Sequence, residues 1–183
     1  KAVIIGGTAG SFQVVTRIIA SLPKNFPLPV FLCLHRLKHV RSGFVEALSI
    51  KSGLPVSEPN DKDPIKSGNI YLAPANYHMY VELGNKFALS TEDAVNHSRP
   101  SIDLSFASAA YNYKRKLVGI ILSGANRDGA IGLKKVKDNG GLTIVQDPAE
   151  CQVATMTNAS MQATNVDHIF KTDEIIRFLL NLK

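Results

Sequence analysis

Cysteine is scarce in this sequence, and its two cysteines form no recognisable pattern. Cys33 lies in the apolar run PVFLCLHR and Cys151 in PAECQV, with no CxxC or metal-like spacing between them. This spacing excludes a disulfide framework, and a reducing compartment is the simpler interpretation.

The sequence also lacks any long hydrophobic run. No stretch approaches the ~18 to 20 apolar residues that a membrane helix requires, and KAVIIGG is far too short for the core of a signal peptide. We therefore expect a cytoplasmic protein without membrane insertion. Because no repeat, low-complexity stretch or long linker divides the 183 residues, we expect a single domain over residues 1–183.

Clustered charge of one sign is limited as well. The net charge of +6 favours an acidic partner, but the basic residues are scattered, and their densest groups are KRK at 114–116 and KKVK at 134–137. No DNA- or RNA-binding motif accompanies them. We therefore expect no nucleic-acid partner and interpret most of this charge as solvated surface.

Apolar runs of strand length are present throughout the chain. They are AVII (2–5), VFLCLH (30–35), NIYLA (69–73), LVGIILS (117–123), LTIVQ (142–146) and DHIF (167–170). Most are continuously apolar rather than alternating, which indicates parallel strands that are buried on both faces. The segment 79–90 differs, because GN separates two alternating runs and predicts an antiparallel hairpin.

Helical patterns lie between several of these strands. The spacing of Val15, Ile18, Ile19 and Leu22 predicts a helix with Ser11 as its N-cap. Further helices are predicted over 42–52, about 101–113, 129–139 and 173–182, the last with Thr172 as its cap. The fold class is therefore α/β: a doubly wound, mainly parallel sheet with helices on both faces and an antiparallel hairpin addition.

Three polar residues follow strands of the predicted sheet. Thr8 follows the first strand, His35 ends the second, and Asp128 lies in SGANRDGA after the most hydrophobic strand. Ligands of open α/β sheets bind beyond the carboxyl ends of the strands, so these side chains are expected to share one edge. Hydroxyl, imidazole and carboxylate are the parts of a nucleophile, base and orienting-acid triad.

The stretch GGTAGS at 6–11 has three possible roles. It matches the nucleophile elbow G-x-S-x-G, with Thr8 in place of serine, and a helix beginning after it would direct free N–H groups to the same point. It could also be a structural turn. A dinucleotide fingerprint would need glycine where Thr8 and Ser11 stand, and no phosphate loop ending in GK[ST] is present. Ser11 is a weak substitute nucleophile.

Structural roles remain open for the other two candidates. His35 could satisfy its nitrogens at the end of a strand, as His39, His78, His97 and His168 could elsewhere in the chain. His168 would complete the common hydrolase order of nucleophile, acid and histidine, but it lies within a strand-like run. Asp128 could also be the N-cap of the helix at 129–139, a role that is compatible with catalysis.

Nearly the whole chain resembles the catalytic domain of the bacterial chemotaxis-type protein-glutamate methylesterase family. The segments that carry the resemblance are VIIGGTAGS, LHRLKHVRSGFVEAL, DPIKSGNIYLAPANYHM, NHSRPSID, VGIILSGANRDGAIGL and GGLTIVQDPAECQVATM. The family's serine, histidine and aspartate fall on Thr8, His35 and Asp128. The resemblance implies hydrolysis of γ-glutamyl methyl esters on chemoreceptors, and receptor glutamine deamidation in some members.

The resemblance also implies how the site would work. The hydroxyl attacks the ester carbonyl, His35 transfers the proton, and Asp128 holds the imidazole. The residues expected to bind the oxyanion or substrate are Ala9, Gly124, Ala125 and Asn126. The implied partner is a methylated chemoreceptor or receptor-like signalling protein, and the mechanism requires no metal or cofactor.

The chain departs from the family pattern in two respects. Thr8 keeps the hydroxyl but carries an additional methyl group, and its β-branching restricts χ1. The receiver domain that precedes the catalytic domain in chemotaxis members is absent from this sequence. These departures motivate an alternative in which the domain is catalytically weakened and acts as a binding or signalling module.

Overall fold

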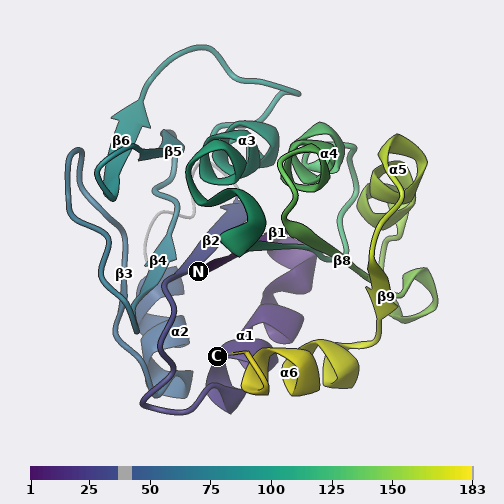
Figure 1. Ribbon diagram of the computed structural model, residues 1–183, viewed down its shortest axis with the longest axis horizontal. Helices are drawn as coiled ribbons and strands as arrows, with labels where there is room; N and C mark the ends of the chain where they lie inside the picture. The colour runs from purple at the N-terminus through teal and green to yellow at the C-terminus, as the bar shows by residue number, and fades with distance from the viewer. Residues whose placement is uncertain (37–42, 183) are drawn as a thin grey trace.

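The computed structural model describes residues 1–36 and 43–182, apart from the side chain of Ala9. Its centre is a seven-stranded parallel sheet (Figure 1). In spatial order the strands are β3 (Val56–Ser57), β4 (Ile70–Leu72), β2 (Val30–His35), β1 (Ala2–Thr8), β7 (Leu117–Ile121), β8 (Leu142–Gln146) and β9 (His168–Phe170). Because β1 lies between β2 and β7, the two halves of the chain extend the sheet in opposite directions from β1.

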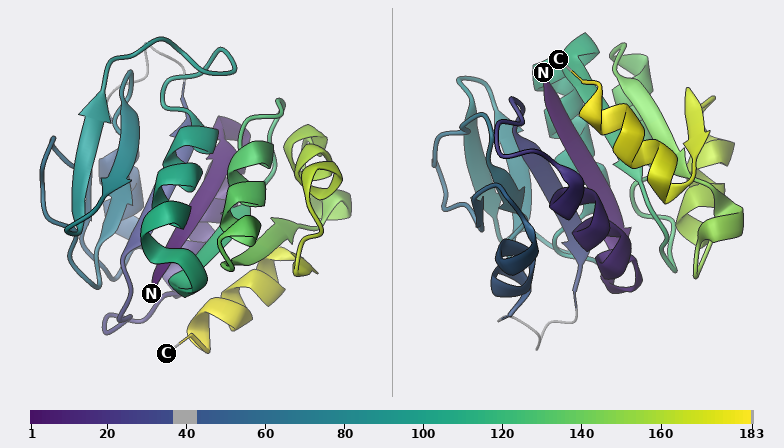
Figure 2. Two further views of the ribbon diagram at one scale, coloured as in Figure 1. Left: turned by 45° about the horizontal axis from the view of Figure 1, so that its top comes forward. Right: turned by 90° about the horizontal axis from the view of Figure 1, so that it is seen from below.

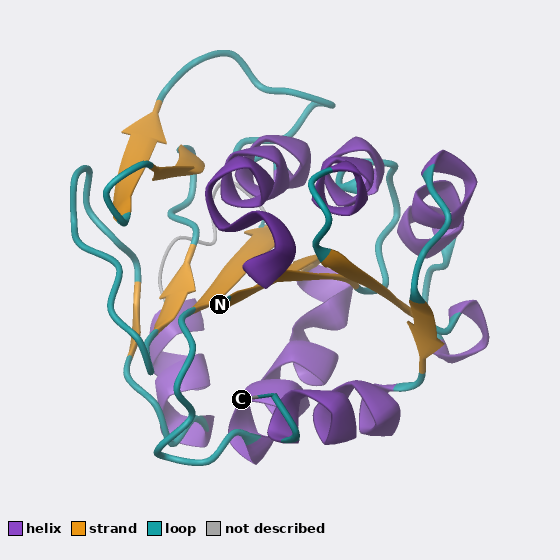
Figure 3. Cartoon of the chain, viewed as in Figure 1, coloured by secondary structure: helices purple, strands orange, loops and turns teal. Residues whose placement is uncertain are grey.

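Helices cover both faces of this sheet (Figure 3). One layer contains α1 (Phe12–Ser21), α2 (Phe44–Lys51) and α6 (Thr172–Leu180). The opposite layer contains α3 (Ile102–Tyr113), α4 (Ala130–Asp138) and α5 (Thr155–Ala163). Three short 3₁₀ helices join the elements: η1 (Ala9–Ser11), η2 (Lys114–Lys116) and η3 (Pro148–Glu150).

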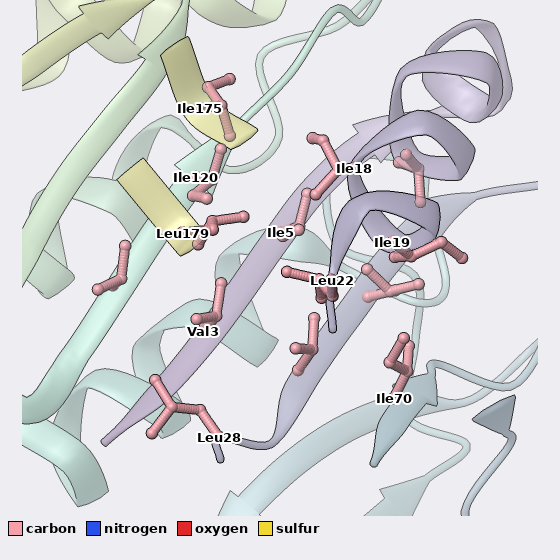
Figure 4. Packing of buried hydrophobic residues seen from close by; sticks show 14 of the residues in the cluster. Val3, Ile5, Ile18, Ile19, Leu22, Leu28, Ile70, Ile120, Ile175 and Leu179 are labelled. Atoms are coloured by element: carbon pink, nitrogen blue, oxygen red, sulfur yellow. The ribbon is translucent and has the colours of Figure 1, made fainter. Parts of the chain in front are cut away.

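Each helix layer buries its own hydrophobic cluster against the sheet. Val3 and Ile5 of β1 pack with Ile18 and Ile19 of α1, as Figure 4 shows for the first cluster. Ile4 belongs to the second cluster, on the side of α3 and α4. Successive side chains of a strand point to opposite faces. Thr8, four residues after Ile4, is therefore directed to the face that α3 and α4 cover.

The antiparallel hairpin consists of β5 (His78–Glu82) and β6 (Lys86–Ser90), and it packs beside α3 (Figure 2). Its turn contains Gly84 and Asn85, both with positive φ, which matches the GN signal. Phe87 of β6 meets Phe31 of the sheet edge to face, with ring centroids 5.7 Å apart. The hairpin therefore adds its buried residues to the second hydrophobic cluster alongside α3.

The predicted fold class is confirmed, and differences are local. Two elements were not predicted: β3, which has only two residues, and α5, whose polar sequence TMTNASMQA has little apolar periodicity. Within the described residues, no helix has the length and apolar character needed to cross a membrane.

Of the helix caps considered from the sequence, one has the right position and two are wrong. Ser11 is the N-cap residue of α1, as predicted, but its hydroxyl makes no cap bond and donates to the carbonyl oxygen of Thr8. The N-cap of α4 is Gly129 rather than Asp128, because the preceding carboxylate turns toward α3 instead. The N-cap of α6 is Lys171, and Thr172 is the first helical residue.

Candidate active site

The three residues predicted from strand ends lie at the carboxyl edge of the sheet. Thr8 and His35 are directly paired in the parallel register of β1 and β2. Asp128 follows β7, the other neighbour of β1. This edge is where the strand order reverses, the usual position of a site in an open α/β sheet.

His35 and Asp128 form a buried hydrogen-bonded pair. His35 Nε2 lies 2.6 Å from Asp128 Oδ2, and the side chains are 13% and 0% exposed. Because a carboxylate only accepts hydrogen bonds, the proton of neutral His35 lies on Nε2. Its Nδ1 therefore carries the lone pair that can accept a proton.

The carboxylate of Asp128 lies at the N-terminus of α3. Its Oδ2 accepts the N–H of Ile102 at 2.6 Å, and its Oδ1 accepts the N–H of Asp103 at 3.0 Å and the hydroxyl of Ser101 at 3.2 Å. Burial alone would raise the pKa of Asp128, but the hydrogen bonds from His35, Ile102 and Asp103 outweigh it and lower the pKa below 3.8. Asp128 is thus held ionised, in the state that can orient an imidazolium.

The backbone of Thr8 is held by hydrogen bonds, whereas its hydroxyl group makes none within the described residues. Its carbonyl accepts the Ser11 hydroxyl at 2.7 Å, and its N–H lies 3.4 Å from the carbonyl oxygen of Ser123. Thr8 Oγ1 makes no hydrogen bond to His35 or to any other described residue. Ser11 is fully buried and its hydroxyl is used by Thr8, so the structure contradicts a role for Ser11 as substitute nucleophile.

The free nitrogen of His35 has two polar neighbours. Asn126 Nδ2 lies 3.2 Å from Nδ1, and Ser98 Oγ lies 3.4 Å from it. Sequence reasoning did not single out Ser98, although it lies in the segment NHSRPSID that carries the family resemblance. The polar neighbours of His35 Nδ1 are therefore Asn126 and Ser98, and the Thr8 hydroxyl is not hydrogen-bonded to this nitrogen.

The expected oxyanion donors differ in availability. The Gly124 N–H already donates to the carbonyl oxygen of Val153 at 3.0 Å, so the expectation that it offers a free donor is not met. The N–H of Ala125 has no acceptor among the described residues, and Ala125 is exposed. The side-chain amide nitrogen of Asn126 lies 3.2 Å from His35 Nδ1, so this donor is already beside the base. Ala9 begins η1, but its side chain lies outside the described part of the structure.

The other histidines lie in different surroundings. His78 is fully buried and bonded to Asp93 and Ser101 through its two ring nitrogens, which is a structural role. His168 stacks on Phe170 with ring centroids 4.6 Å apart and does not contact Asp128. His39 lies outside the described residues. Over residues 1–36 and 43–182, no group of three or more His, Cys, Asp or Glu side chains could hold a metal ion.

Comparison with known proteins gives a consistent result. The family model described as CheB methylesterase matches residues 3–179. A Leptospira interrogans relative is 38% identical over 182 residues, an alignment covering 100% of this chain and 94% of the relative. A Thermotoga maritima protein-glutamate methylesterase/protein-glutamine glutaminase is 33% identical over 189 residues, and the alignment covers only 54% of that longer protein.

A solved structure extends the similarity to three dimensions. The crystal structure of the Thermotoga maritima CheB methylesterase catalytic domain matches with a TM-score of 0.95 and 32% sequence identity. The match covers 100% of this chain and 98% of that domain. The order of layers and strands described above is therefore shared across the whole domain.

Proposed function

The chain belongs to the CheB methylesterase family, and from this premise we propose that it hydrolyses γ-glutamyl methyl esters on methylated chemoreceptors or receptor-like signalling proteins. The names of its relatives add a second reaction of the same chemistry, the hydrolysis of glutamine side chains. Both reactions transfer the glutamyl acyl group to water. Such a substrate would be met in the cytoplasm.

The residues are proposed to act in two half-reactions. Thr8 Oγ1 attacks the ester carbonyl carbon while His35 Nδ1 accepts the hydroxyl proton, and Asp128 stabilises the imidazolium that forms. The C–O bond then breaks, and the methoxide leaves as methanol with the proton from Nδ1. A water molecule, deprotonated by the same nitrogen, hydrolyses the acyl-threonine and regenerates Thr8. The candidate hydrogen-bond donors to the oxyanion are the backbone N–H of Ala125 and the side-chain amide of Asn126.

The observation that carries this proposal is the buried pair of His35 and Asp128 beside the register position of Thr8. In this pair, an imidazole with a free nitrogen is held by an ionised carboxylate at the carboxyl end of the strands, where α/β sheets bind their ligands. The pair is typical of acyl transfer, in which the imidazole must become charged for an instant.

The test is methanol release from methylated receptor by the native chain, Thr8→Ser, Thr8→Val and His35→Ala. Thr8→Val removes the hydroxyl and keeps the branched shape, so it is the matched control for the nucleophile. We expect Thr8→Ser to be faster than the native chain by about tenfold to a hundredfold, since a misplacement near 1 Å costs a rate on that order. Loss of activity in Thr8→Val would support Thr8 as the attacking group.

Two results would count against the proposal. If neither the native chain nor Thr8→Ser exceeds His35→Ala, the chain is not an esterase for this substrate. If Thr8→Val keeps the native rate, the hydroxyl comes from elsewhere, and Ser98→Ala then tests the other hydroxyl near His35.

The second candidate function is a binding module with weakened catalysis. It is favoured by Thr8, whose hydroxyl makes no hydrogen bond to His35, and by Asn126, whose amide faces the base instead. The net charge of +6 would suit an acidic receptor helix. Turnover by the native chain equal to that of Thr8→Ser would remove the reason for this candidate.

A further inference from the structure

The carboxylates of Asp103 and Asp128 both accept hydrogen bonds from one side-chain amide, that of Asn96. Asn96 Nδ2 lies 3.0 Å from Asp103 Oδ2 and 3.2 Å from Asp128 Oδ1. An amide nitrogen has two N–H groups, so one Asn96 side chain can donate to both acids at once. This arrangement also fixes which end of the Asn96 amide carries nitrogen, because an oxygen there would face two acceptors.

The two acids stabilise each other's helices. Asp128 precedes α4, yet it accepts the N–H groups of Ile102 and Asp103 in the first turn of α3. Asp103 belongs to α3, yet its Oδ1 accepts the N–H groups of Gly129 and Gly132 at 2.9 and 2.7 Å at the start of α4. Each helix N-terminus thus binds the carboxylate that the other segment supplies, which is favourable for an anion.

This exchange places like charges close together in a buried site. Asp103 is 8% exposed and Asp128 is 0% exposed. Burial raises the pKa of Asp103, and the charge of Asp128 raises it further, whereas hydrogen bonds lower the pKa of Asp128. The other ionisable groups near the two acids are His35, which is bonded to Asp128, and Cys33 of β2. Arg127, in the loop before α4, lines the same hollow as Asp103. Asn96 is the neutral donor inserted between the acids.

We propose that Asn96 is a positioning residue for the reaction: its amide separates the two carboxylates and holds Asp128 Oδ1, so that Oδ2 remains directed at His35 Nε2. This inference rests on the proposed function only for its catalytic consequence. The backbone supports the assignment, since Asn96 has φ 52°, a left-handed conformation that asparagine tolerates better than most residues. Asn96 does not touch the reacting atoms and acts through Asp128.

The test uses Asn96→Gly and Asn96→Asp. Glycine accommodates the positive φ and deletes the amide, while aspartate keeps the shape and replaces the two donors with a third carboxylate. The matched control is Asn85→Gly, because Asn85 has φ 63° and also makes two side-chain hydrogen bonds, to Ile65 and Tyr113, in the distant hairpin. The measurements are kcat and KM for methanol release and a carbon-13 NMR titration of the Asp103 and Asp128 carboxyl groups.

We expect Asn96→Gly to lower kcat by about tenfold with little change in KM, because Asp128 loses one of its hydrogen bonds and is held less firmly toward His35. The pKa of Asp128 should rise in Asn96→Gly and rise further in Asn96→Asp. Asn85→Gly should lose comparable stability while keeping kcat and both carboxyl titrations. A parallel fall of kcat in both glycine variants, in proportion to unfolding, would show a merely structural role and overturn the proposal.

The titration separates this inference from the proposed function. If the native chain proves inactive, the esterase proposal fails, but a raised pKa of Asp128 in the Asn96 variants still supports the positioning role. If the titration of Asp128 is unchanged in both Asn96 variants, the positioning role is refuted, whatever the activity.

Discussion

Replacing Asp128 with asparagine is the sharpest perturbation of the site. The two carboxylate oxygens of Asp128 accept hydrogen bonds from five donors. His35 and Ile102 donate to Oδ2, and Asp103, Ser101 and Asn96 donate to Oδ1. An asparagine has only one oxygen, so whichever way it turns, its NH₂ group faces at least two donors. With NH₂ on the side of the imidazole, His35 must move its proton to Nδ1 and lose the lone pair that accepts the hydroxyl proton.

The size of this effect follows from the change in tautomer. A triad whose aspartate is replaced by asparagine with this change of tautomer falls in kcat by about 10⁴-fold, which corresponds to about 5.5 kcal/mol in the barrier. The assay is methanol release under saturating substrate, using Thr8→Ser as the starting enzyme if the native rate is low. An Asp128→Asn variant within tenfold of its parent, alongside an inactive His35→Ala, would refute the role given to Asp128.

The same substitution has a pH signature in stability. The folded pKa of Asp128 is lowered from 3.8, so its ionised form stabilises the fold at neutral pH, and this contribution is lost as the pH falls through the folded value. The free energy of unfolding in urea should therefore be lower for Asp128→Asn than for the native chain by about 1.5 to 3 kcal/mol near pH 7. This is the typical contribution of a hydrogen bond to a charged group. The gap should shrink below about pH 4. A constant gap from pH 7 to pH 3 would contradict the ionised, stabilised carboxylate.

Two further predictions concern the surroundings of the site. A Cβ on Gly7 would collide with the Ser11 hydroxyl, so Gly7→Ala should cost about 1 to 3 kcal/mol in urea unfolding and lower activity by displacing Thr8; native stability and rate in this variant would count against that packing. Burial raises the pKa of Cys33 to about 12, so iodoacetamide at pH 8 should leave Cys33 unmodified in the native protein and alkylate it in urea, as peptide mass spectrometry would show. Rapid alkylation of native Cys33 would show that the second cluster opens.

Much of the architecture was predictable because it depends on short-range patterns. Continuous apolar runs indicated buried parallel strands, and the ends of β1 and β2 placed Thr8 and His35 at one edge. The helix α5 escaped prediction because its buried residues, such as Met156 and Ala159, are held by tertiary contacts rather than by a strong apolar stripe. Local signals identify an element only when its own sequence carries the periodicity.

The supporting residues of the site were less predictable for a different reason. Asn96 and Ser98 lie in an irregular segment, and no pattern in it shows that they face Asp128 and His35. His35 was correctly expected as a partner of Asp128, but the capping role also considered for Asp128 was wrong, although an aspartate before a helix normally caps that helix. Here the carboxylate binds a neighbouring helix instead, and only the packing of α3 against α4 determines that choice.

The position of β1 between β2 and β7 has a consequence for how the site comes into being. His35 and Asp128 are 93 residues apart in sequence, and they meet only after β1 has acquired a neighbour on each side. Such long-range closure is slow and entropically costly, and no half of the chain can supply both groups. The pair therefore cannot form until the chain has been synthesised past Asp128 and β1 has paired with both β2 and β7.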